Sequence, residues 1–243
     1  KRSFLIEPAF IIDISAFPDL EGVIDAVYNP LRTNLVLDAQ EAGIPAEGGL
    51  YMLSAQAVYA CGHFLGCEME SRDIDKAFTN VLNSKRNIVL IGMPSCGKTT
   101  IGLELANALG KPLYDTDDLV IDNIGMEISD YFAKEGEQAF RDRESEAIAS
   151  IASGTGMIIA TGGGAVLRRE NVRALKRNGI VIFLDRPLEK LITTDDRPLS
   201  SSREALEKRY NERIDIYRNS ADIIIDASGT VDEVAASILS FIQ

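Results

Sequence analysis

The feature that most constrains the fold is the stretch IGMPSCGKTTIG, residues 91–102, which contains the pattern Gly-x4-Gly-Lys-Thr. An apolar, strand-like run, NIVLI, precedes it, and a helix is predicted to begin near Lys98. Glycines let backbone N–H groups converge on phosphate oxygens, and the helix N-terminus adds the positive end of its dipole. In this pattern Lys98 bridges the terminal phosphates, and the Thr99 hydroxyl ligates magnesium. The stretch therefore predicts a loop that binds ATP, through Gly92, Pro94, Ser95, Cys96, Gly97, Lys98, Thr99 and Thr100.

Residues 86–243 alternate short β-rich runs with amphipathic helical segments, which is the pattern of a parallel α/β sheet. Five strands are predicted, at NIVLIG, PLYDT, MIIATGG, VIFLD and IIIDAS, with a closing helix from Val231. The helices between the strands are expected to end near Leu109, Ser153, Lys176 and Arg218. We therefore expect one α/β domain in this part of the chain.

Residues 1–84 have a different pattern, and the polar stretch Asn83–Asn87 marks the predicted boundary between domains 1–84 and 86–243. A strand is predicted at VIDAVY, a turn at Asn29-Pro30, and helices near 32–42, 52–65 and 73–82. This is half of a Rossmann-type unit. A half-sheet has an unpaired edge, so we expect the segment to pack on something else.

Composition excludes several classes of protein. Hydrophobic residues make up 46% of the 243, enough for a core, and the net charge of −12 leaves no basic face for nucleic acid. No apolar run approaches the roughly 20 residues that span a bilayer, and a signal-peptide pattern is lacking, so we expect a soluble cytoplasmic protein. The cysteines are expected to stay reduced, with Cys61 and Cys67 facing apart on one helix. A single histidine, His63, excludes a multi-histidine metal site and disfavours a histidine general base.

The acceptor of the phosphoryl group must be read from the carboxyl ends of the other strands, where open parallel sheets bind ligands. Asp115 and Asp117 follow PLY, and we expect the two carboxylates on one face of an extended segment. One is suited to magnesium and the other to a substrate hydroxyl. The alternative is an ordinary acidic turn.

A second cluster follows the strand MIIAT, where Gly162, Gly163 and Gly164 expose backbone N–H groups to a small ligand. Arg141, with Glu144 one helical turn on, and Arg213 in a later helix could hold a substrate carboxylate bidentately. Surface salt bridges are the alternative for either arginine.

A third cluster is Arg197-Pro198-Leu199, in a polar stretch that we interpret as a lid. A lid arginine can close over the γ-phosphate, exclude water and stabilise the transferring charge. A solvated run of charges is the alternative. Together the clusters favour a small polyhydroxylated anion as acceptor, because a nucleoside monophosphate calls for more arginines.

Six stretches, IGMPSCGKTTIG, DTDD, GEQAFRDRE, TGGGAV, DDRPLS and ERIDIY, resemble shikimate kinase in order and spacing over residues 87–243. The resemblance implies a nucleoside-monophosphate-kinase-like P-loop fold with a lid, and ATP- and Mg²⁺-dependent transfer to the 3-hydroxyl of shikimate. It assigns Lys98 and Arg197 to the transferring phosphate and Thr99 with Asp115 to magnesium. The residues that it assigns to shikimate are Asp117, Arg141, Gly163, Gly164 and Arg213, with Gly162 in the same turn and Asp117 as base or orienter of the hydroxyl.

One residue departs from the family pattern, and one other interpretation competes with the resemblance. Lys190 stands where many members carry an arginine that stacks on adenine, and a lysine cannot stack as a plane. A kinase of the same fold with a different acceptor, such as a gluconate-type sugar-acid kinase, is the competing interpretation, and TGGGAV with DTD argues against it.

Residues 19–82 resemble the C-terminal end of shikimate dehydrogenase, through Tyr28-Asn29-Pro30, Thr33 and Gly49-x-x-Met52-Leu53-x-x-Gln56. The Gly-x-Gly-x-x-Gly turn and the catalytic Lys–Asp pair of that family are absent, so dehydrogenase activity is not expected. The segment is expected to be a remnant or a piece of a bifunctional protein that serves packing or assembly, with a second copy or a dehydrogenase as partner.

Overall fold

The structure is a computed structural model, and it describes residues 12–191 and 203–242. The chain forms two compact units, Lys1–Phe78 and Thr79–Gln243. Each is described by itself below. In the described ranges, none of the helices combines the length and the apolar character needed to span a membrane.

The second unit contains a five-stranded sheet in which all neighbouring strands are parallel, as predicted. Its strands are β3 (Asn87–Ile91), β4 (Leu113–Asp115), β5 (Ile158–Ala160), β6 (Gly179–Asp185) and β7 (Ile223–Asp226), in the order β4-β5-β3-β6-β7. From β3 the chain passes to the edge strand β4, returns to β5 beside β3, and then continues on the other side of β3 through β6 and β7. Ligands of open parallel sheets bind at such a reversal of strand order, here at the carboxyl end of β3.

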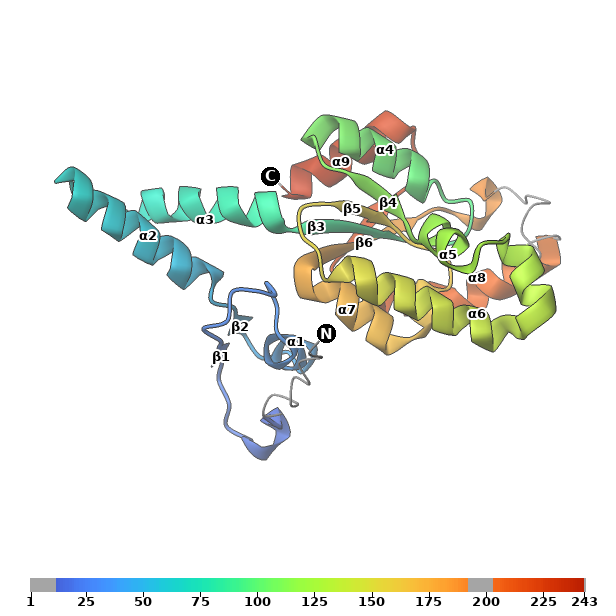
Figure 1. Cartoon of the computed structure of the whole chain (residues 1–243), viewed down its shortest axis with the longest axis horizontal. Coiled ribbons are helices and arrows are strands. Elements are labelled where there is room, and N and C mark those ends of the chain that lie inside the picture. Colours follow the sequence, from blue (N-terminus) through green and yellow to red (C-terminus); the bar gives the residue numbers. More distant parts are fainter. Residues whose placement is uncertain (1–11, 192–202, 243) are drawn as a thin grey trace. The chain divides into compact units, whose positions relative to one another are not determined.

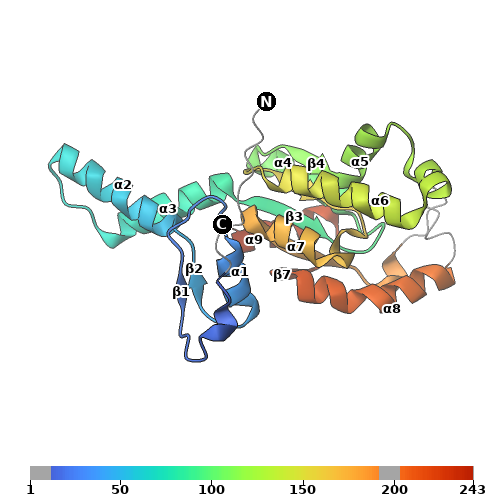
Figure 2. The same cartoon turned by 60° about the horizontal axis from the view of Figure 1, so that its bottom comes forward.

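Helices cover both faces of this sheet (Figure 1). On one face lie α4 (Lys98–Leu109) and α9 (Val231–Ile242), and on the other lie α6 (Ile128–Ala152), α7 (Arg169–Asn178) and α8 (Arg203–Ser220). α6 and α7 are side by side in both views (Figure 1, Figure 2). The short helix α5 (Thr116–Ile124) and the 3₁₀ turns η2 (Ala165–Leu167) and η3 (Leu188–Lys190) follow strands β4, β5 and β6. These three elements therefore lie at the edge of the sheet where the carboxyl ends of the strands meet.

The core of this unit is the sheet itself. All five residues of β3 are buried, as are most of β5 and β6, because helices cover both faces of a parallel sheet. A fully buried Val, Leu, Ile or Phe stabilises the fold by about 1.5–3 kcal/mol. Phe183 of β6 stacks on Tyr217 of α8 with ring centroids 5.3 Å apart. The strand that leads into the predicted phosphate-binding loop is therefore buried on both faces.

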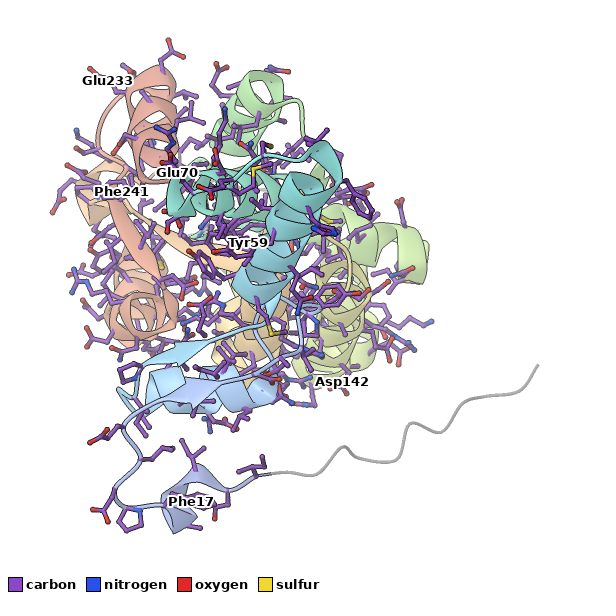
Figure 3. The ribbon with its side chains drawn as sticks, turned by 90° about the vertical axis from the view of Figure 1, so that its left-hand side faces the viewer. Phe17, Tyr59, Glu70, Asp142, Glu233 and Phe241 are labelled. Atoms are coloured by element: carbon purple, nitrogen blue, oxygen red, sulfur yellow. The ribbon has the colours of Figure 1, made fainter. Side chains whose placement is uncertain are left out.

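The first unit is smaller and its strands are shorter than predicted. β1 (Val23–Ile24) and β2 (Ala46–Glu47) form a two-stranded parallel sheet, so only two residues of VIDAVY are strand. The helices are α1 (Asn34–Glu41) and α2 (Leu50–Leu65), with a 3₁₀ turn η1 (Ile14–Ala16) before them. Several large apolar side chains stay exposed, among them Phe17 and Tyr59, which Figure 3 labels.

The prediction for the two cysteines was wrong in one respect. α2 ends at Leu65, and Gly66 takes the left-handed conformation that terminates a helix. Cys67 therefore lies beyond the helix that carries Cys61, and both cysteines are exposed and unpaired.

Helix α3 (Ser71–Lys85) runs past its predicted end at residue 82 and begins in the first unit. Residues of the second unit donate hydrogen bonds to the backbone carbonyls of its last turn. Nζ of Lys111 donates to the carbonyl of Asn83 at 2.7 Å, and the N–H of Gly156 donates to the carbonyl of Lys85 at 2.7 Å. Burial lowers the pKa of Lys111, and the charge of Arg86 adds to this effect. One residue, Arg86, separates the helix from β3, so the end of α3 is part of the second unit.

Candidate active site

The loop between β3 and α4 has the backbone that its glycines predict. Gly92 and Gly97 have φ of 152° and 99°, a region that side chains disfavour, and Ser95 has φ of 63°. A side-chain carbon at Gly92 would lie 2.9 Å from Sγ of Cys96 and 3.0 Å from the carbonyl of Leu184. Only glycine fits there. The loop ends at Gly97, where the N-terminus of α4 begins.

Lys98 lies over this loop. Its side chain is nearly buried, and Nζ donates to the carbonyls of Gly92 at 3.0 Å and Met93 at 2.9 Å. Cys96 is fully buried below, with Sγ 3.8 Å from Nζ. The ammonium is thus held at the centre of the loop, where a terminal phosphate of a bound nucleotide would replace the carbonyls as its partner.

Thr99 and Asp115 come together as predicted. The Thr99 hydroxyl donates to Oδ2 of Asp115 at 2.7 Å. Both supply oxygen, which is the donor that Mg²⁺ prefers, and Mg²⁺ commonly takes one or two protein ligands and completes its shell with phosphates and water. Within the described ranges no three or more His, Cys, Asp and Glu side chains cluster as a metal cage. The pair therefore suits a metal that arrives with a nucleotide.

Asp117 does not share an extended segment with Asp115, so this prediction was wrong. Asp115 ends β4 and caps α5, its Oδ1 accepting from the N–H of Asp117 at 3.0 Å, while Asp117 stands in the first helical turn. Aspartate is a favoured helix N-cap because its carboxylate satisfies a free N–H group. The two carboxylates are thereby separated, one facing Thr99 and the other facing the glycine turn, where a side-chain carbon at Gly162 would overlap Oδ1 of Asp117.

Arg141 is held beside this turn by acidic side chains. Nη1 of Arg141 pairs with Oε2 of Glu144 at 2.8 Å and Nη2 with Oε1 of Glu137 at 3.3 Å. Arg141 and Glu144 are 8% and 1% exposed, so the alternative of a surface salt bridge does not apply. Burial raises the pKa of Glu144, and the charge of Arg141 opposes that shift. A side-chain carbon at Gly164 would overlap the guanidinium of Arg141.

Arg213 reaches the same turn from α8. Its Nη1 donates to the carbonyl of Gly163 at 3.1 Å. A side-chain carbon at Gly163 would lie 3.0 Å from the ring of Pro94, so the glycine turn touches the phosphate loop. The structure therefore brings Asp117, Arg141 and Arg213 together around Gly162–Gly164, next to the nucleotide side of the site.

Two residues that the sequence analysis did not assign hold this turn in place. The hydroxyl of Thr116, which is fully buried, accepts from the N–H of Gly162 at 2.8 Å. The hydroxyl of Tyr217, which is 1% exposed, donates to the carbonyl of Gly163 at 2.5 Å. Burial raises the pKa of Tyr217, so it stays a neutral donor at physiological pH. Its position one helical turn after Arg213 is the signal that could have identified it.

Lys190 and Arg197 were assigned to the nucleotide rather than to this turn. Lys190 lies in η3, and its Nζ donates to the carbonyl of Ser228 at 2.8 Å, which joins η3 to the turn before α9. Arg197 lies outside the described residues.

Comparison with known proteins identifies the second unit. The family model described as Shikimate kinase matches residues 94–243. A shikimate kinase of Clostridium botulinum (strain Alaska E43 / Type E3) is 43% identical over 162 residues, which are 65% of this chain and 98% of that protein. A shikimate kinase of Symbiobacterium thermophilum is 53% identical over 105 residues, covering 43% of this chain and 60% of that protein.

Solved structures agree with these relatives. The structure titled "Shikimate kinase from Acinetobacter baumannii in complex with shikimate" is 33% identical with a TM-score of 0.63, over 68% of this chain and 96% of that one. The shikimate kinase of Aquifex aeolicus is 32% identical with a TM-score of 0.57, over 63% of this chain and 94% of that one. The resemblance of residues 19–82 to a dehydrogenase stays a prediction. Through its second unit, the chain belongs to the shikimate kinase family.

Proposed function

We propose that the chain transfers the γ-phosphoryl group of ATP to the 3-hydroxyl of shikimate, giving shikimate 3-phosphate and ADP. The observation that carries this proposal is the contact between Gly163 and Pro94, which joins a cluster of one carboxylate and two arginines to the phosphate loop. That cluster suits a small hydroxylated carboxylic acid.

The nucleotide side is supported by the loop and Lys98. Phosphoryl transfer needs little covalent chemistry from the protein, so catalysis depends on positioning and on stabilising charge. The loop N–H groups hold the phosphates, and Nζ of Lys98 exchanges the carbonyls of Gly92 and Met93 for phosphate oxygens. Arg197 is proposed to close over the γ-phosphate, and Lys190 to contact the adenine.

Magnesium is proposed to bind at Thr99 and Asp115, whose oxygens lie 2.7 Å apart and match its preference for oxygen donors. The ion neutralises charge on the phosphates when it is bound. Thr99 stands at the start of α4 and Asp115 at the end of β4, so the two ligands are fixed by separate elements of the sheet edge.

The acceptor side is assigned by charge. Arg141 and Arg213 hold the carboxylate of shikimate, while the N–H groups of Gly163 and Gly164 contact the ring substituents. Asp117 orients the 3-hydroxyl and accepts its proton as the hydroxyl oxygen bonds to the γ-phosphorus and the bond from that phosphorus to the bridging oxygen of ADP breaks. A carboxylate is sufficient for this step, because charge stabilisation rather than base strength dominates phosphoryl transfer.

The test is to identify the product by ³¹P NMR after incubation with ATP, Mg²⁺ and shikimate. The Asp117→Asn variant keeps the shape of the side chain and should lower kcat by at least about 100-fold, the lower end of the range for general base catalysis, with little effect on the Kd of ADP. Asp122→Asn, an exposed position on the same helix, is the matched control and should keep native rates. Full activity in Asp117→Asn would contradict the assigned role.

For the first unit we infer a shikimate-dehydrogenase-like, partial Rossmann-like segment that assembles with a second copy or with a dehydrogenase. Its support is the resemblance of residues 19–82 and the exposure of apolar side chains such as Ile24 and Phe64, which are 90% and 86% exposed. Deleting residues 1–70 keeps all of α3 and its contacts with the second unit. Light scattering should show that the deleted chain no longer self-associates or no longer binds a dehydrogenase. If the deletion changes neither self-association nor dehydrogenase binding, the assignment is contradicted. The predicted cytoplasmic location is part of the same proposal.

A further inference from the structure

Arg186 is the residue that follows β6, at the carboxyl end of a strand paired directly with β3. Because parallel neighbours end at the same edge, this places Arg186 beside the loop that leaves β3. A side-chain carbon at Gly97 would lie 3.8 Å from Nη1 of Arg186. The guanidinium thus reaches the point where the phosphate loop becomes the N-terminus of α4.

This side chain is half-buried, and the described residues offer its polar atoms no partner. Nε of Arg186 is buried without a hydrogen bond, and the residues that the structure describes provide no hydrogen bond or ion pair for its guanidinium. The neighbouring carboxylate does not neutralise it, since Oδ2 of Asp185 pairs with Nη2 of Arg218 at 3.3 Å. Buried polar groups almost always have partners, and an arginine stays charged at any physiological pH.

Packing does not account for this arrangement. An arginine that only filled space would gain from turning its head toward water, as long charged side chains usually do. Here Nη1 lies near Gly97 at the start of α4, where the first N–H groups of the helix are donors without intrahelical partners. Donors this close together are best satisfied by an acceptor that both can contact.

We propose that Arg186 is a further nucleotide-binding residue, whose guanidinium contacts the β-phosphate of ATP and ADP where the loop N–H groups near Gly97 hold it. The assignment rests on the proposed function for the identity of the nucleotide. Lys98 bridges the β- and γ-phosphates, so the two cations share the β-phosphate and only Lys98 reaches the γ-phosphate. A planar guanidinium can donate two parallel hydrogen bonds to one phosphate.

The experiment is isothermal titration calorimetry of the full chain, which measures the Kd of ADP in the presence of Mg²⁺ and, separately, the Kd of shikimate. Arg186→Gln should raise the Kd of ADP about tenfold, the effect of one charge-assisted hydrogen bond, and leave the Kd of shikimate within about twofold. Arg218→Gln is the matched control, because it removes a neighbouring arginine whose partner is Asp185. It should bind ADP like the native chain.

The outcomes separate this assignment from the proposed function. A native chain that binds ADP, with Arg186→Gln binding equally well, overturns the role of Arg186 alone. A native chain that binds no ADP overturns both. If Arg186→Gln does not fold, Arg186→Met keeps the aliphatic stem and decides by the same criterion. An equal loss for shikimate and ADP would show a general distortion and overturn the assignment.

Discussion

Replacing Gly164 with alanine adds one carbon at the position that Arg141 occupies. The backbone of Gly164 has φ of −100° and ψ of −8°, which alanine adopts without strain, so the effect is purely steric. The new carbon would overlap the guanidinium of Arg141 and lie 2.8 Å from its Nη2. The guanidinium cannot simply rotate away, because Nη1 is paired with the buried Glu144 at 2.8 Å.

The size of the effect follows from what Arg141 must give up. A hydrogen bond to a charged group contributes about 1.5–3 kcal/mol. If displacement removes one such bond between Arg141 and the substrate carboxylate, kcat/KM for shikimate falls about 10- to 150-fold, at about 1.36 kcal/mol per factor of ten. The KM for ATP should stay within about twofold, because the phosphate loop is untouched.

The assay is steady-state ADP release with each substrate varied in turn. Gly154→Ala is the matched control: the added carbon would lie 2.6 Å from the flexible end of Met157 and 3.4 Å from the carbonyl of Ile151, and Gly154 precedes β5 whereas the glycine turn follows it. It should keep native constants. A Gly164→Ala variant with native kcat/KM for shikimate would refute the placement of Arg141 beside this turn.

Other substitutions test the remaining contacts. Tyr217→Phe keeps the stacking on Phe183 and removes one hydrogen bond worth about 1 kcal/mol, so we expect about a fivefold rise in the KM for shikimate and a Tm lower by about 2–4 °C. Asp115→Asn should raise the Mg²⁺ concentration needed for half-maximal activity, measured by Mg²⁺ titration, and an unchanged requirement would remove Asp115 from the metal site. Because burial raises the pKa of Glu144, its contribution to the free energy of unfolding is complete below pH 4.5 and declines as the pH rises through the raised value. Denaturant melts from pH 4 to 7 should show the free energy of unfolding falling more steeply with pH in the native chain than in Glu144→Gln. Equal pH dependence in the two chains would contradict the raised pKa of Glu144.

The fold of the second unit could be predicted because most of its strands are apolar runs bounded by polar or glycine residues. NIVLI, for example, is buried at all five positions and leads into a loop whose glycines mark its turn. The order β4-β5-β3-β6-β7 was not predicted, since pairing depends on packing between elements that are distant in sequence. The end of α3 was underestimated because Lys111 and Gly156, residues far along the chain, satisfy its last carbonyls.

Site residues could be predicted where the pattern within a single stretch of sequence determines their positions. Lys98 follows from the loop pattern, and the Arg141–Glu144 pair follows from helical spacing. Asp115 and Asp117 were misjudged because an aspartate that ends a strand also caps the next helix. Thr116 and Tyr217 bind backbone atoms of a turn that lies in another part of the chain. Arg186 is recognisable only in the structure, by a buried Nε that has no partner among the described residues and by the closeness of its Nη1 to Gly97.

The most direct test of the central claim is ADP release by the purified chain with ATP and Mg²⁺, with shikimate, gluconate or a nucleoside monophosphate added in turn. The account predicts release with shikimate and only background release with the other two. Release with gluconate or a nucleoside monophosphate in place of shikimate would contradict the acceptor assigned to Asp117, Arg141 and Arg213.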